Sequence, residues 1–144
     1  QACVNSGKRL PRNDEWQAAV AGTPDPGPDN GTSDCNAGNT GMKSNTGSRS
    51  ACVSRSGNFD MVGNLDEWTA DWVPLSGACP GWGAFSNDAM CLNGTQAAIN
   101  PGAIVRGGNF GIGFGGGTDA GPLEVRGDVA VSAADAVIGF RCAR

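Results

Sequence analysis

The amino-acid sequence predicts a loop-rich, disulfide-bonded domain with one clear helix and a few short strands. The chain has 144 residues, about the length of one domain, and 24 of them are Gly and 8 are Pro. These residues favour turns and left-handed backbone and argue against a helical bundle. Six cysteines without a C-x-x-C pair, in a chain without histidine, indicate three disulfides rather than a zinc site. Disulfides in turn imply an oxidising compartment.

The helix is expected between Pro11 and Gly22. Proline is favoured at the first turn of a helix, and Asn13 can act as the N-cap. Trp16 and Val20 are four residues apart and therefore share one face. Gly22 supplies the stop signal at the C-terminal end.

The segment 58–73 predicts a tight turn followed by a strand. The turn is placed at Gly63-Asn64, and the strand is expected to bury Leu65, Trp68 and Trp72.

Further strands are expected in the C-terminal third of the chain. Residues 104–110 form a strand pattern that is interrupted by the pair Gly107-Gly108, which indicates a bulge or a close backbone approach. Short strands are predicted at 123–125 and 129–131, and a closing strand at 137–144. The segments 23–57 and 74–103 are predicted to be long loops.

Charge and hydropathy exclude two classes of partner. Charged residues make up 17% of the chain and the net charge is −4, so the clustered Lys and Arg of a nucleic-acid surface are missing. No segment approaches the roughly 20 apolar residues that span a bilayer. Together with the oxidising compartment that the disulfides imply, this predicts a secreted protein, extracellular or periplasmic. Its ligand is expected to be a protein or a glycan.

Four separated motifs resemble one family. They are GKRLP at 7–11 with EW at 15–16, DMVGNLDEW at 60–68 with DW at 71–72, RGGNF at 106–110, and GFRC at 139–142. In this order and spacing they resemble the C-terminal half of the formylglycine-generating enzyme, or sulfatase-modifying factor, family. Either the chain is a fragment, or another segment or chain completes the fold.

The resemblance implies an α+β fold like that of C-type lectins, here as one domain over residues 1–144. Spacing alone leaves fifteen disulfide pairings open. The family pairs the cysteine before its GKRLP motif with that of its GFRC motif. The resemblance therefore implies the pairings Cys3–Cys142, Cys35–Cys52 and Cys79–Cys91.

The family's catalytic chemistry is not expected in this chain. The two copper-binding cysteines of the family correspond to Ile112 and Gly117, neither of which is a thiol. A related branch uses histidine-bound iron, and this sequence has no histidine. We expect no copper, haem or nucleotide. Adjacent or paired carboxylates could do acid–base work, but we interpret them as structural or solvated charges: Asp66 with Glu67, and Glu124 with Asp135.

Calcium is the cofactor that the resemblance implies, in a structural role. One family site uses backbone oxygens and a carboxylate, corresponding to Val62, Gly63, Leu65 and Glu67. These are hard oxygen ligands of the kind that calcium prefers. A second family site corresponds to Asn36 and the carbonyl of Ala37.

The stretch 109–135 is expected to form the exposed ligand face. Diversified variable proteins of retroelements, which belong to the same superfamily, use this region for protein recognition. Because binding hot spots favour aromatic residues and Arg, Phe114 and Arg126 are the candidate ligand-binding residues. Phe110 is assigned to the core.

Three functions remain compatible with the sequence. The first is a non-catalytic binding or structural module on a calcium-stabilised scaffold. The second is a sulfatase-modifying-type oxidoreductase whose reactive residues lie outside this chain. The third is a subunit of a surface assembly or filament.

Overall fold

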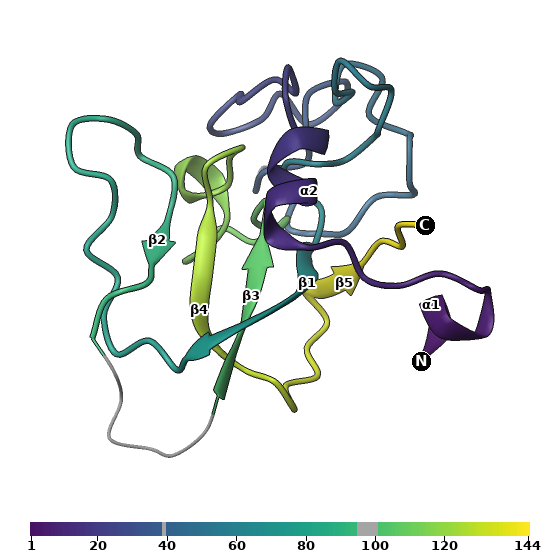
Figure 1. Ribbon diagram of the computed structural model, residues 1–144. Helices are drawn as coiled ribbons and strands as arrows, with labels where there is room; N and C mark the ends of the chain where they lie inside the picture. Colours follow the sequence, from purple (N-terminus) through teal and green to yellow (C-terminus); the bar gives the residue numbers. More distant parts are fainter. Residues whose placement is uncertain (39, 95–100) are drawn as a thin grey trace.

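A mixed five-stranded sheet forms the centre of the computed structural model, which describes residues 1–38, 40–94 and 101–144 (Figure 1). The strand order is β2-β4-β3-β1-β5. β3 pairs antiparallel with both β1 and β4, while the outer strands β2 and β5 pair in parallel with β4 and β1. The strands are β1 Asp66–Pro74, β2 Met90–Cys91, β3 Pro101–Arg106, β4 Val125–Ala130 and β5 Ile138–Phe140.

The predicted turn and strand of residues 58–73 are present, but one predicted core residue is exposed. Gly63 and Asn64 both have positive φ angles, as the turn requires. Trp72 is 66% exposed, so its assignment to the core is wrong, and Trp68 is only partly buried. The spacing of these tryptophans places both on the same side of a strand, and that side faces outward along most of β1.

The glycine pair after β3 ends the strand through a close backbone approach. Gly107 and Gly108 have φ angles of +88° and +78°. A Cβ atom on Gly108 would lie 2.4 Å from the Cβ of Ala120. β3 therefore ends at Arg106, earlier than the predicted strand 104–110.

The two short strands predicted at 123–125 and 129–131 are instead one strand, β4. Residues 126–128, which separate the two predicted strands, do not interrupt β4. A Cβ on Gly127 would lie 2.6 Å from Cγ2 of Val73, so the glycine leaves room for that side chain. The predicted closing strand 137–144 is reduced to β5 and one isolated bridge between Arg9 and Ala143.

The predicted helix is α2, Asn13–Ala19, and a second short helix, α1 Ala2–Asn5, precedes it. Asn13 is the first helical residue rather than the N-cap. Its side-chain oxygen accepts a hydrogen bond from Arg106 Nε at 2.7 Å, so it is not available to cap. Trp16 and Val20 are buried in the core, as predicted.

Loops cover one end of the sheet and enclose the main core. The segment between α2 and β1 carries no helix or strand in its described residues and lies across the end of the sheet toward which β3 runs (Figure 1). The core beneath it joins this segment to the helix and comprises Trp16, Val20, Cys35, Cys52, Met61 and Val62. Disulfide Cys35–Cys52 is therefore part of the core.

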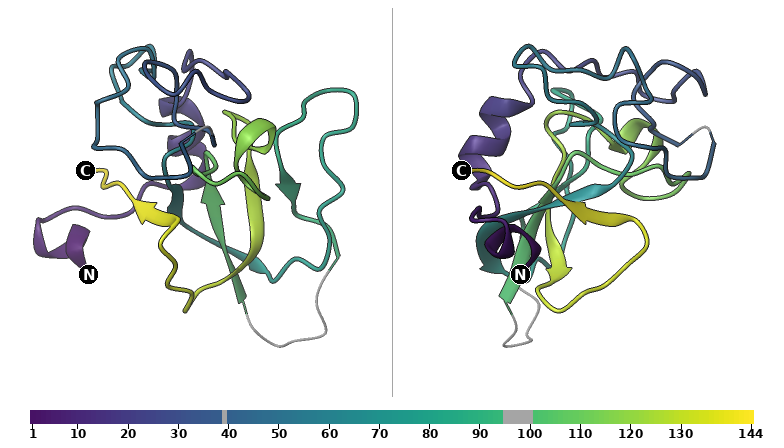
Figure 2. Two further views of the ribbon diagram at one scale, coloured as in Figure 1. Left: turned by 180° about the vertical axis from the view of Figure 1, so that it is seen from behind. Right: turned by 90° about the vertical axis from the view of Figure 1, so that its right-hand side faces the viewer.

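The two chain ends lie near each other, as both views in Figure 2 make visible. All three predicted disulfides, Cys3–Cys142, Cys35–Cys52 and Cys79–Cys91, are confirmed. Within the described residues, no helix is long and apolar enough to cross a membrane.

Candidate functional site

Glu67, a predicted calcium ligand, joins three parts of the fold through hydrogen bonds. Its Oε2 accepts from Trp16 Nε1 at 2.8 Å and from Arg141 Nε at 2.5 Å, and its Oε1 accepts from Arg141 Nη2 at 2.6 Å. The carboxylate thus forms a bidentate ion pair, the strongest common geometry for such a pair. The motifs that contain these residues meet at this point.

A cavity of about 160 Å³ lies beside this ion pair. Of the predicted calcium ligands, Leu65 and Glu67 line it. The other two are placed differently: Val62 is in the hydrophobic core, and the Gly63 carbonyl accepts the N–H of Leu65 at 2.8 Å. The calcium site stays a prediction.

Asp60 also lines this cavity and was missed by the sequence reasoning. Its Oδ2 accepts the backbone N–H of Gly47 at 2.7 Å, whereas its buried Oδ1 has no hydrogen-bond partner. Burial raises the pKa of this carboxyl above its usual value. An unpartnered buried oxygen in a polar cavity is what a hard cation would satisfy, so the residues present fit an ion here. In the sequence, the signal that could have identified Asp60 is an acidic residue three positions before the predicted turn at Gly63-Asn64.

The second predicted calcium site is occupied by protein groups. Asn36 Oδ1 accepts from Arg49 Nη2 at 3.1 Å and from Thr40 Oγ1 at 3.2 Å. The amide nitrogen of the same side chain donates to the Met42 carbonyl at 2.8 Å. The backbone of Ala37 is fixed through its N–H, which donates to Asp29 Oδ2 at 2.8 Å. This arrangement does not fit a metal ion.

The positions of the family's catalytic thiols lie in the segment after β3, here called the glycine loop (residues 109–117). Ile112 is 86% exposed, and Gly117 begins the short 3-10 helix Gly117–Asp119. Because all six cysteines of the chain form disulfides, none of them offers a free thiol.

The glycine loop is held by its own hydrogen bonds. Asn109 N–H donates to the Gly115 carbonyl at 2.8 Å, and its Oδ1 accepts from Gly111 N–H at 2.8 Å. Gly116 N–H donates to the Gly113 carbonyl at 2.9 Å. The backbone of the loop is therefore ordered and holds the side chains of the loop in defined positions.

The loop also contacts the layer that precedes β1. A Cβ on Gly38 would lie 2.6 Å from the Gly111 carbonyl oxygen, so the two backbones touch. Phe110, which was assigned to the core, is only half-buried.

Phe114 and Arg126, the predicted ligand-binding residues, lie together. The guanidinium carbon of Arg126 is 5.0 Å from the centre of the Phe114 ring, a cation–π geometry. Phe114 is 52% exposed, whereas Arg126 is largely covered. Of this pair, Phe114 is the one that offers its surface to a ligand.

Beneath Arg126 lies a buried ionic cluster that the sequence reasoning interpreted only as structural charge. Arg126 pairs with Asp66 at 3.4 Å and with Asp128 at 3.1 Å. Asp66 also accepts a hydrogen bond from Asn109 Nδ2 at 2.9 Å. Burial raises the pKa of Asp66 to about 6, and burial together with the Asp66 charge raises the pKa of Glu124 well above its usual value. Glu124 is fully buried, whereas Asp135, with which it was grouped, is exposed.

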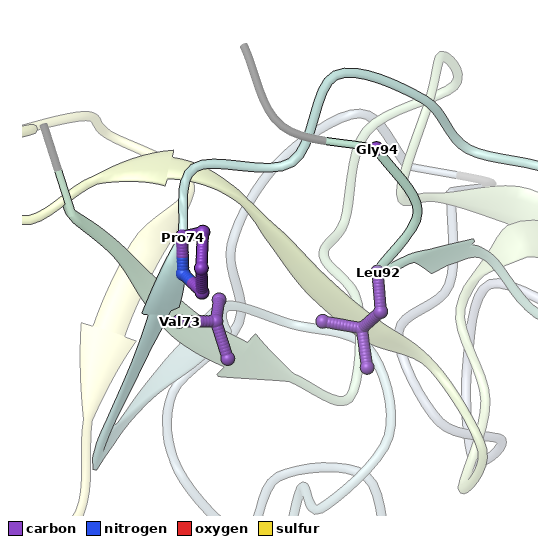
Figure 3. Close-up of a pocket in the computed structure, with 4 residues that line it drawn as sticks. All are labelled: Val73, Pro74, Leu92 and Gly94. Carbon is purple, nitrogen blue, oxygen red and sulfur yellow. The ribbon is translucent and has the colours of Figure 1, made fainter. Parts of the chain in front are cut away.

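Another pocket has a volume of about 460 Å³ and a mainly apolar lining (Figure 3). It is lined by Val73, Pro74, Leu92 and Gly94. Figure 3 shows these residues converging from the end of β1 and from the segment after β2. None of these four described residues carries a titratable side chain.

Comparison with known proteins places the chain in a family. Residues 2–144 match the model of the "Sulfatase-modifying factor enzyme 1-like domain". No curated protein matches the chain. A solved structure, "Major Tropism Determinant U1 Variant", aligns with a TM-score of 0.68 and 21% sequence identity over 98% of this chain, which spans 35% of that protein. At this identity the likeness supports the fold, which is that of C-type lectins. This protein therefore belongs to the sulfatase-modifying factor family, whose model matches residues 2–144 and three of whose motifs meet at Glu67.

Proposed function

We propose that this chain is a non-catalytic, secreted binding module whose recognition surface is the glycine loop. The observation that carries the proposal is the exposure of Ile112 and Phe114 on a loop whose backbone is already ordered. Large apolar side chains held in water contribute little to folding. Because the segment that carries them is already ordered, less conformational entropy is lost when a ligand binds.

Three further findings support this proposal. The family's thiol positions are Ile112 and Gly117, so the part of the fold that would carry catalysis carries an apolar side chain instead. The structural neighbour is named a tropism determinant, and we transfer from it only the idea of selective recognition. The three disulfides are typical of proteins that work in an oxidising compartment outside the cytosol.

The binding surface can be tested with a random-peptide phage library panned on the wild-type protein. Synthetic copies of the enriched peptides are then measured against an Ile112→Asp/Phe114→Asp double variant. We expect affinity to fall by about tenfold or more, the loss of one hot spot. Val4→Asp is the matched control because Val4 is 64% exposed but lies in α1. Peptides that bind the double variant as tightly as the wild type would refute the proposal.

The absence of family catalysis is tested separately. A cysteine-containing peptide is incubated with the protein, copper and oxygen, and the products are analysed by mass spectrometry. We expect no aldehyde product. Turnover by this chain would favour the oxidoreductase alternative and overturn the binding-module proposal.

We also propose that the cavity beside Asp60 holds a structural calcium ion. Asp60 Oδ1 and the Leu65 carbonyl would supply its protein oxygens, and the ion would add positive charge beside an otherwise unpartnered carboxylate oxygen. Glu67 would join them only by exchanging one of its bonds to Arg141 for the ion. An ion that binds only the folded state raises the melting temperature. We expect calcium to stabilise the wild type relative to EDTA, Asp60→Asn to remove that effect, and Asp135→Asn to keep it. Equal melting temperatures in calcium and EDTA would contradict the site.

A further inference from the structure

Arg49 is buried in the segment between α2 and β1, whose described residues form no helix or strand. It is 5% exposed, and its guanidinium lies between two other buried polar side chains. Nη2 donates to Asn36 Oδ1 at 3.1 Å, and Nη1 is 3.7 Å from Asp29 Oδ1. A buried charge of this kind is stable only when it is paired and hydrogen-bonded.

The two partners of Arg49 organise the surrounding backbone. Asp29 accepts the N–H of Gly31 at 2.6 Å through Oδ1 and the N–H of Ala37 at 2.8 Å through Oδ2. Asn36 donates to the Met42 carbonyl and accepts from Arg49 with its other end. A single positive charge therefore holds together segments on both sides of Cys35, which is itself bonded to Cys52.

Asn36 Oδ1 and Asp29 Oδ1 are the kind of oxygens that a metal ion would need, and the guanidinium already faces both: it donates a hydrogen bond to the amide oxygen and balances the charge of the carboxylate. A divalent cation added beside Arg49 would place three positive charges in a buried position against the two carboxylates on which the Arg49 charge acts, Asp29 and Asp60, which is unfavourable. We infer that the guanidinium of Arg49 is a built-in cation that takes the place of a metal ion between Asp29 and Asn36.

The inference distinguishes the position between Asp29 and Asn36 from the cavity beside Asp60. At the Asp60 cavity a carboxylate oxygen lacks a partner, whereas here the oxygens that face the guanidinium have one. The chain should thus bind calcium at one position and exclude it at the other, although both lie in the layer of loops that precedes β1. The inference does not depend on the calcium proposal, because a protein that binds no calcium at all would also leave the Asn36 position metal-free.

The first experiment measures the cost of removing the charge. Arg49→Met keeps the length of the side chain, Arg49→Lys keeps the charge, and Arg55→Met is the control because Arg55 is an exposed arginine of the same loop layer. Removing the positive charge beside the buried Asp29 carboxylate should lower the melting temperature by about 10 °C in Arg49→Met. We expect a smaller loss in Arg49→Lys and none in Arg55→Met. An Arg49→Met variant as stable as the wild type would overturn the inference.

The second experiment measures metal binding and does not need an Arg49 variant to fold. Metal binding is measured by terbium luminescence and by calorimetric titration with calcium, on the wild type, on Asp60→Asn and on Asn36→Ala. We expect at most one ion per chain in the wild type, none in Asp60→Asn, and unchanged affinity in Asn36→Ala. An ion that remains in Asp60→Asn and binds at least about tenfold more weakly in Asn36→Ala would place metal at Asn36 and overturn the inference.

Discussion

The buried ionic cluster under the glycine loop predicts a specific dependence of stability on pH. Asp66 is almost fully buried, and one of its carboxylate oxygens has no hydrogen-bond partner. Burial raises its pKa from 3.8 to about 6, against the opposing effects of Asn109 and Arg126. The folded protein therefore holds this proton at pH values where the unfolded chain has released it.

The sign and size of the effect follow from the two pKa values. The contribution of Asp66 to the free energy of unfolding is fully present below pH 3.8 and is lost as the pH rises through about 6. Since one pKa unit corresponds to about 1.36 kcal/mol, the whole loss amounts to about 3 kcal/mol, of which about 2.4 kcal/mol falls between pH 4 and pH 7. The raised pKa of Glu124 acts in the same direction.

The assay is urea unfolding at pH 4 and at pH 7.5, with the disulfides intact. Asp66→Asn cannot titrate, so the difference between its two unfolding free energies should be smaller than that of the wild type by about 2.4 kcal/mol. Asp135→Asn, which removes an exposed carboxylate, should follow the wild type. Because the comparison uses differences between two pH values, a constant change in stability cancels. If Asp66→Asn and the wild type lose the same free energy, the electrostatic reasoning is wrong.

Two further predictions concern the disulfide that joins the chain ends and the core. Replacing Cys3 and Cys142 together by Ser should lower the free energy of unfolding by about 5 kcal/mol, from the entropy of opening a loop this long. Urea unfolding checks this, and a loss below about 1 kcal/mol would contradict it. Trp16→Ala should cost about 3–5 kcal/mol because Trp16 is fully buried, whereas Trp72→Ala should cost far less because Trp72 is mostly exposed. Equal costs in thermal unfolding would show that the outward side of β1 is covered in solution.

The sequence was sufficient to predict the disulfide pairs and the general architecture. The motifs around Glu67 and Arg141 are separated by more than 70 residues, yet they meet in one ion pair. Their joint presence is why a family resemblance could predict the fold. The turn at Gly63-Asn64 was predictable because its left-handed backbone favours those residue types.

The contacts of individual side chains were less predictable. The position of Trp72 depends on which side of β1 faces the core, and the pattern of large residues did not reveal it. The role of Arg49 depends on loops that bring Asp29 and Asn36 to it from 20 and 13 positions away. No local sequence pattern predicts such a contact. Asp60 was missed because its unpartnered oxygen becomes apparent only when the cavity around it is known.

The bridge between Cys3 and Cys142 has a mechanical consequence. The Cα atoms of the two residues are 5.5 Å apart, although 139 positions separate them in sequence. A force that pulls the two termini in opposite directions passes through the covalent sulfur–sulfur bond and does not reach the strands. While that bond is intact, the sheet cannot be unzipped by tension along the chain, and any sequence joined at either end would transmit load past the domain without extending it.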